Sequence, residues 1–144
     1  MNYKITKLDF SYYDKIIDLW ELSGLSHRPK GRDSKKSMKN EFELGQTAFL
    51  GLFDNQKLIG VVLTSSDGRK GWINRLAIHP DYRGRGLAQK LIKASEDFLH
   101  SLGINVIAAL IEGENQESFR AFEKAGYLIH NDVKYLSKRS SPDD

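Results

Sequence analysis

The chain has 144 residues and a formal net charge of +3, with 40% hydrophobic and 28% charged residues and no cysteine. This length and composition indicate one domain over residues 1–144, and the mild charge does not point to nucleic acid. The lack of an apolar run of about 18 residues argues against a membrane span, and four scattered histidines argue against a metal site. With no apolar signal peptide at the start, we expect a cytoplasmic protein.

The first part of the chain predicts a strand followed by two helices. Weak alternation of apolar and polar residues indicates a strand over residues 3–8. Apolar residues at helical spacing then indicate a helix that ends at Gly24. A loop rich in basic residues occupies positions 27–36. A second helix is expected at about 34–44. The basic loop fits an acidic acceptor molecule, although most charge runs of this kind are only solvated.

The middle of the chain predicts three antiparallel strands. Apolar runs with high β-propensity cover residues 47–53, 58–64 and 72–78, and polar turn residues separate them. Consecutive strands joined by short turns pair as hairpins. The third of these strands ends at Pro80.

The last part of the chain predicts alternating helices and strands. An amphipathic helix begins at Leu87 and closes before Gly103, and a helix capped by Asn115 stops at Gly126. Between them, residues 105–111 form an almost continuous apolar run, as expected for a strand parallel to strand 72–78. A final pair of short strands, at 127–129 and 133–136, and a frayed tail, at 138–144, complete the prediction.

These elements predict an α+β fold in the order β-α-α-β-β-β-α-β-α-β-β. The central sheet is expected to be mixed and mostly antiparallel, because only the strand that follows the long helix has a parallel neighbour. Helices should cover both faces of the sheet.

The junction between strand 72–78 and the long helix predicts an anion site. Gly84 and Gly86 let the backbone curl so that several N–H groups point outward, with the positive end of the helix behind them. A dinucleotide fingerprint would need a third glycine where Gln89 stands. A nucleoside-triphosphate loop would need Gly-Lys-Ser/Thr, which the chain lacks.

Two motifs in this half of the chain resemble those of one enzyme family. Arg83-x-x-Gly86-x-Ala88 resembles the acyl-coenzyme A site of the GNAT superfamily of N-acetyltransferases. About 30 residues later, the segment from Asn115 to Tyr127 is similar to the closing Asn-to-aromatic motif of the same family. The resemblance covers residues 72–127. A Leu-Trp pair, Gly24 and the basic loop also resemble the bacterial branch near the ribosomal-protein N-terminal acetyltransferases.

The resemblance implies that acetyl-coenzyme A is the acyl donor, and the scattered histidines already favour a site without a metal. The donor's pantetheine arm would pair with the backbone of strand 72–78, which must therefore separate from strand 105–111. Its diphosphate would bind the N–H groups of the glycine loop. The residues that this resemblance assigns to the donor are Leu76, Ala77, Ile78, Arg83, Gly84, Arg85, Gly86, Leu87, Ala88, Asn115, Phe122 and Lys124. Asn115 also suits a helix cap, and Lys124 also suits a solvated helix position.

The acid and base of the reaction are less defined. Many relatives have a tyrosine four residues before the glycine that corresponds to Gly126, but this chain has Phe122 there. Tyr127, Tyr135, Ser118 or a water are the remaining candidates to protonate the thiolate. Glu112, with Glu114 beside it, is the candidate base, because it follows a strand next to the expected cleft. Solvated loop carboxylates are the simpler interpretation of both.

The expected function is the transfer of an acetyl group from acetyl-coenzyme A to a primary amine, by direct attack in a ternary complex. The amine belongs to a small molecule, a protein N-terminus or a lysine. A non-catalytic acyl-coenzyme A binding module is the alternative, supported by the missing tyrosine. The expected partners are the donor and an amine, with no nucleic acid or membrane, and the expected state is a monomer or a homodimer.

Overall fold

A computed structural model describes residues 2–144 and shows five strands in one sheet, in the order β1-β2-β3-β4-β5. The strands are β1 (Tyr3–Lys7), β2 (Thr47–Asp54), β3 (Lys57–Ser66), β4 (Gly71–Ile78) and β5 (Ile107–Ala108). The helices are α1 (Tyr13–Ser23), α2 (Lys35–Phe42), α3 (Leu87–Ser101) and α4 (Gln116–Lys124), with short 3-10 turns η1 (Phe10–Tyr12) and η2 (Pro80–Tyr82).

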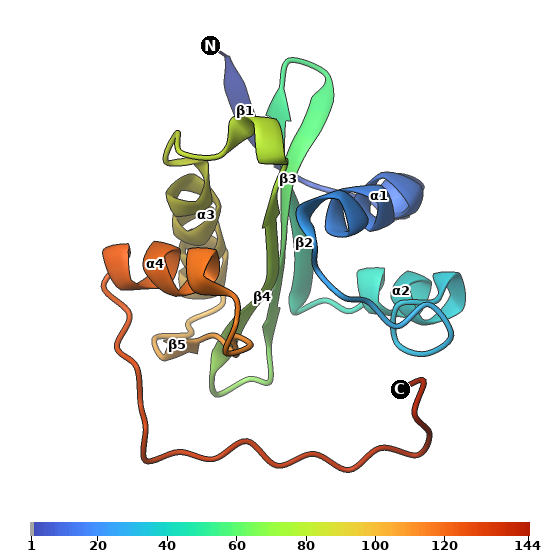
Figure 1. The fold of residues 1–144 in the computed structure, drawn as a ribbon, viewed down its shortest axis with the longest axis vertical. Helices are drawn as coiled ribbons and strands as arrows, with labels where there is room; N and C mark the ends of the chain where they lie inside the picture. The colour runs from blue at the N-terminus through green and yellow to red at the C-terminus, as the bar shows by residue number, and fades with distance from the viewer. Residues whose placement is uncertain (1) are drawn as a thin grey trace.

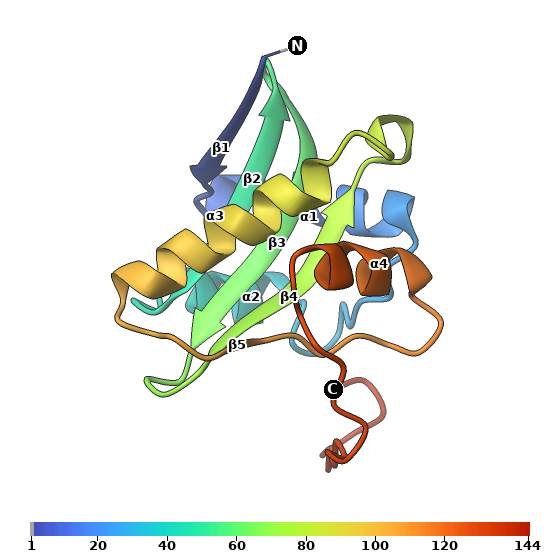
Figure 2. The same ribbon diagram turned by 90° about the vertical axis from the view of Figure 1, so that its left-hand side faces the viewer.

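Helices cover both faces of the sheet, as predicted. α1 and α2 lie on one face, and α3 and α4 lie on the other (Figure 1). α3 crosses the sheet diagonally, and the start of this helix points toward the end of β4 (Figure 2). The first four strands pair antiparallel and β5 pairs parallel to β4, which confirms the mixed, mostly antiparallel α+β fold.

Each face of the sheet has its own apolar core. Leu91 and Leu99 of α3 are fully buried in one cluster, while Ile16 and Trp20 of α1 belong to the other. Gly71 allows α3 to lie close to β4, because a Cβ on this residue would be 2.5 Å from a methyl carbon of Leu99. The apolar period of α3, which is visible in the sequence, therefore decides how the helix sits on the sheet.

β4 and β5 separate after a very short ladder. They pair only through Gly71 with Ile107 and Trp72 with Ala108, which confirms the predicted opening of the sheet. The predicted strand over residues 105–111 is accordingly reduced to two residues. Beyond Trp72, the edge of β4 that faces away from β3 has no neighbouring strand among residues 2–144.

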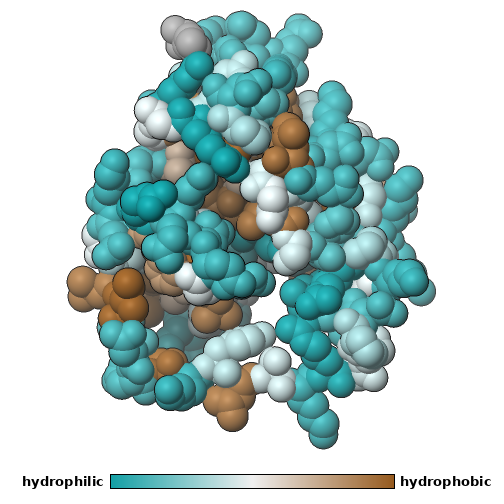
Figure 3. Space-filling model, in the orientation of Figure 1, coloured by the Kyte–Doolittle hydropathy of each residue, from teal (hydrophilic) through white to brown (hydrophobic). Residues whose placement is uncertain are grey.

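The predicted final pair of strands is wrong, since residues 125–144 contain no strand. A strand needs a partner of comparable length, and the two-residue β5 offers too short an edge. The segment instead runs across the bottom of the molecule (Figure 1), where Leu128, Val133 and Leu136 are 79%, 71% and 85% exposed. Brown apolar patches mark the lower part of the surface in the same view (Figure 3).

The predicted frayed tail, residues 138–144, ends in a turn against the α1–α2 connection. Arg139 Nη1 donates to the backbone carbonyl of Asp144 over 2.5 Å. A Cβ on Gly31 would collide with the carbonyl oxygen of Asp143, so the two backbones are in contact. Among the described residues, no helix is both long and apolar enough to cross a bilayer.

Candidate active site

The loop between η2 and α3 has the geometry that the two glycines predicted. Gly84 and Gly86 have φ values of +78° and +73°, in the left-handed region that L-residues rarely adopt. Gly86 precedes α3 and provides no side-chain cap for its first N–H groups. The space beside both glycines is open, since a Cβ on either would meet no atom within 4 Å. The start of α3 is therefore a suitable site for an anion.

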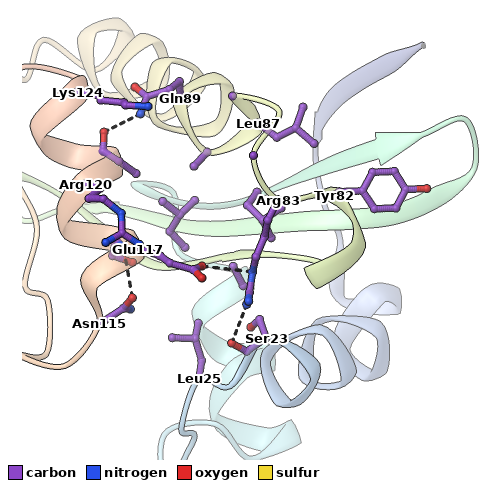
Figure 4. Close-up of a pocket in the computed structure, with 18 residues that line it drawn as sticks. Ser23, Leu25, Tyr82, Arg83, Leu87, Gln89, Asn115, Glu117, Arg120 and Lys124 are labelled. Atoms are coloured by element: carbon purple, nitrogen blue, oxygen red, sulfur yellow. Dashed lines mark hydrogen bonds and ion pairs between the residues drawn. The ribbon is translucent and has the colours of Figure 1, made fainter.

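A first pocket of about 360 Å³ lies beside this loop, between β4, α3 and α4 (Figure 4). The predicted donor-binding residues line it, with the exception of Arg85 and Phe122. They are Leu76, Ala77, Ile78, Arg83, Gly84, Gly86, Leu87, Ala88, Asn115 and Lys124. Asn115 also caps α4, because its side chain accepts the N–H of Ser118 over 3.2 Å.

The open edge of β4 faces this pocket. His79 donates its backbone N–H to the carbonyl of Ile59 on β3 over 2.7 Å. Successive N–H groups of a strand point to opposite edges, so that of Ile78 points away from β3. Ile78 lines the first pocket, and β5 does not reach it. Backbone N–H groups at an open strand edge can take a hydrogen-bond partner, and an extended ligand arm would provide one.

A second pocket of about 680 Å³ adjoins the first. It is lined by Asn74 and Arg75 of β4 and by the segment after β5, which includes Glu112 and Glu114. The two pockets share Ser23, Leu25, Leu76, Arg83, Asn115, Glu117, Ser118 and Arg120. A molecule in the first pocket can therefore meet a molecule in the second.

Arg83 spans the boundary between the two pockets. Its Nε lies 3.2 Å from Glu117 Oε2 at the start of α4, and its Nη2 donates to the carbonyl of Ser23 at the end of α1 over 3.2 Å. Figure 4 shows Arg83 extended between these two helices. The sequence did not indicate this contact, since Ser23, Arg83 and Glu117 are far apart in the chain.

Arg85 differs from the predicted role, because its side chain lines neither pocket. The guanidinium lies 4.9 Å from the ring centroid of Tyr82, and Nη1 donates to the hydroxyl of Tyr3 over 3.2 Å. Neighbouring residues of a tight turn point in different directions, so Arg83 and Arg85 do not share a target.

The structure does not bring the two predicted tyrosine acids to the pockets. The Tyr127 hydroxyl donates to Glu96 of α3 over 2.7 Å, and burial together with this hydrogen bond raises the pKa of Tyr127 well above its ordinary value. Tyr135 lies in the segment beyond α4 and is 69% exposed. Phe122 is almost fully buried and contributes to the wall of the second pocket. Of the other candidates, Ser118 lines both pockets and Glu112 lines the second.

Arg75 is a site residue that sequence reasoning missed. It has φ +56° in the irregular part of the β3–β4 pairing, and its guanidinium lies 4.2 Å from the ring centroid of Trp20. Its Nη2 lies 3.9 Å from Asp33 Oδ2, while burial lowers the pKa of Arg75 below its ordinary value. An arginine inside a strand gives no local sign that it is held in this way.

No cluster of three or more possible metal-ligating side chains occurs within residues 2–144. The polar side chains that line the pockets carry carboxylate, guanidinium, amide, hydroxyl and ammonium groups.

The chain matches one protein family over most of its length. The profile of the Acetyltransferase (GNAT) family matches residues 13–127. The chain is 31% identical over 127 residues to acetyltransferase SG1711 of Sodalis glossinidius, a match that covers 88% of each chain.

Two solved structures have a similar fold. One is the PaiA N-acetyltransferase of Thermoplasma acidophilum in complex with coenzyme A, with a TM-score of 0.80 and 21% identity. The match covers 90% of this chain and 92% of that one. The other is the ribosomal-protein-alanine N-acetyltransferase of Brucella melitensis, with a TM-score of 0.74 and 15% identity. The match covers 96% of this chain and 100% of that one.

Proposed function

The chain belongs to the acetyltransferase (GNAT) family and is an acetyl-coenzyme A-dependent N-acetyltransferase, and we propose that it acetylates a primary amine by direct attack within a ternary complex. The acceptor amine is carried by a small molecule, a protein N-terminus or a lysine. The observation that carries this proposal is the pair of adjoining pockets that share a wall along the open edge of β4.

The donor occupies the first pocket in this proposal. Its diphosphate binds the free N–H groups at the start of α3, where the helix dipole also favours negative charge. Its pantetheine arm lies along Leu76 to Ile78 and supplies the hydrogen-bond partners that β5 does not. This places the thioester toward the wall that the two pockets share.

The acceptor occupies the second pocket, and Glu112 is its base. An alkyl ammonium must lose a proton before it can attack, and the Glu112 carboxylate lines this pocket. The neutral amine nitrogen then bonds to the thioester carbon, whose oxygen becomes an oxyanion. The backbone N–H of Ile78 points away from β3 and is available to stabilise that oxyanion.

Collapse of this intermediate breaks the carbon–sulfur bond and releases the thiolate of coenzyme A. The attacking nitrogen is now cationic and loses one proton, which passes through the Ser118 hydroxyl or a water to the thiolate, so the products are the neutral amide and the thiol. Ser118 is the hydroxyl-bearing candidate acid that lines both pockets. Much of the rate enhancement comes from holding amine and thioester together in adjoining pockets. The site therefore needs no covalent acetyl-enzyme.

The test is the release of free thiol from acetyl-coenzyme A with a panel of primary amines, including a peptide with an N-terminal alanine, a lysine peptide and a polyamine. We expect turnover with at least one of them. Glu112→Gln should lower kcat by about 10²-fold, the usual range for a lost general base. Its control is Glu123→Gln, an exposed α4 residue outside both pockets, which should retain wild-type turnover. Full activity of Glu112→Gln would exclude this base.

A further inference from the structure

The cleft contains an ion pair that a bound donor would disturb. Arg83 holds the carboxylate of Glu117 at 3.2 Å, and both residues line both pockets. Arg83 also belongs to the loop whose N–H groups we assign to the diphosphate. The same guanidinium therefore lies in the pocket proposed for the donor and neutralises an acidic side chain of the pocket proposed for the acceptor.

A diphosphate is a stronger partner for this guanidinium than a single carboxylate. It carries more negative charge, and its oxygens match the fork of N–H donors that arginine presents. The existing pair is easily exchanged, because the side chains of Arg83 and Glu117 are 38% and 58% exposed. The second contact of Arg83 is a neutral one, to the Ser23 carbonyl at 3.2 Å, and does not hold the side chain against a charged ligand.

We propose that Glu117 is an acceptor-binding residue that Arg83 masks until the donor binds. The donor's diphosphate draws the Arg83 guanidinium away, and the freed Glu117 carboxylate then binds the cationic form of the acceptor. This inference rests on the proposed diphosphate and acceptor sites.

The charges of the second pocket support this role. Its wall contains Glu112, Glu114 and Glu117, balanced by Arg75, Arg83 and Arg120. Arg75 lies 3.9 Å from Asp33, so its charge is already matched in part outside this group. When the diphosphate takes over Arg83, the pocket becomes net acidic, which favours a cation. Binding of the donor thus prepares the pocket for the acceptor, and the acceptor should bind second.

Calorimetry with coenzyme A alone tests the exchange, because no acceptor or turnover is needed. Glu117→Gln removes the competitor for Arg83, so we expect this variant to bind coenzyme A about fivefold more tightly, the scale of an exposed ion pair. Glu114→Gln removes an equal charge that has no ion pair with Arg83, and its affinity should change by less than about twofold. In an Arg83→Gln background, Glu117→Gln should have no further effect.

Steady-state kinetics with an amine that the enzyme acetylates test the proposed role of Glu117 in acceptor binding. Glu117→Gln should raise the KM of the amine by about tenfold, the scale of a charge-assisted contact, with kcat nearly unchanged. Glu117 also lies in the first turn of α4, where an acidic side chain stabilises the helix. Thermal unfolding of the variant therefore accompanies both measurements, and loss of stability alone would not make coenzyme A bind more tightly.

The outcomes separate this inference from the proposed function. If Gly86→Glu abolishes coenzyme A binding but Glu117→Gln leaves its affinity unchanged, the diphosphate site stands and the exchange with Arg83 is refuted. Equal gains in coenzyme A affinity in Glu117→Gln and Glu114→Gln would show only a general effect of charge. That result would also refute the exchange with Arg83. An unchanged amine KM in Glu117→Gln would refute the acceptor role.

Discussion

Replacing Gly86 with Glu should abolish coenzyme A binding while leaving the domain folded. The new Cβ meets no atom within 4 Å, so the structure offers room for the side chain. The substitution strains the backbone, because φ at this residue is +73°. An L-residue there lowers the free energy of unfolding by about 1–2 kcal/mol. For a domain of this size, that corresponds to a fall in Tm of only several degrees, roughly 2–4 °C for each kcal/mol.

The effect on binding should be much larger than this strain. A carboxylate about 5 Å from a bound phosphate, at an effective dielectric constant of about 20, is repelled by about 3 kcal/mol for each unit of phosphate charge. That energy alone lowers the affinity by about two orders of magnitude. The side chain also competes for the N–H groups at the start of α3, for which Gly86 provides no side-chain cap.

Isothermal calorimetry with coenzyme A measures this loss, and Gly103→Glu is the matched control. Gly103 follows the other end of α3, has φ +80° and also faces open space. Its substitution carries the same strain, and a negative charge at a helix C-terminus adds to the destabilisation. We expect Gly103→Glu to bind coenzyme A like the wild type. If Gly86→Glu keeps its affinity, or if both variants lose it equally, the assignment of the diphosphate to this loop is wrong.

Three further predictions concern the wall of the acceptor pocket and the core behind it. Phe122→Tyr should match or exceed the wild-type kcat, because a phenol in that wall can protonate the thiolate, and a loss above about tenfold in steady-state assays would contradict this. Asp33→Ala should lower the free energy of unfolding in urea by about 3 kcal/mol, because the buried Arg75 guanidinium loses a carboxylate at 3.9 Å, and a change below about 1 kcal/mol would refute that role. Burial raises the pKa of Glu41 above its ordinary 4.5, so the native state binds this proton more tightly and the stability should fall as pH rises from 4.5 through the raised value. Glu41→Gln should remove that fall in urea titrations between about pH 4 and 8, and an unaltered pH profile would exclude it.

Short stretches of the sequence were enough to predict the backbone conformation of the glycine loop and the cap of α4. The φ values of Gly84 and Gly86, and the cap that Asn115 provides for α4, depend on residues a few positions away. The apolar period of α3 likewise marks the face that packs on the sheet. Local backbone geometry of this kind is set by sterics and hydrogen bonds between near neighbours, so a motif can reveal it.

The contact partners of side chains could not be predicted in this way where those partners lie far away in the sequence. Arg83 and Arg85 look alike in sequence, yet one faces the cleft and the other lies on Tyr82. Tyr127 is a predicted acid, but its hydroxyl donates to Glu96, a residue of a helix more than 20 positions earlier. Which partner a side chain reaches depends on how whole elements pack.

The sequence by itself determined the order of the helices and strands as far as α4, the mixed sheet and the glycine loop at the start of α3. Only the tertiary structure decided that β5 is two residues long, that the predicted closing strands remain unpaired and that Arg83 joins Ser23 to Glu117. The physical reason is the range of the interactions. Helix periods and turn conformations are encoded within a few residues, whereas strand pairing and ion pairs across a cleft require segments that are distant in the chain to meet.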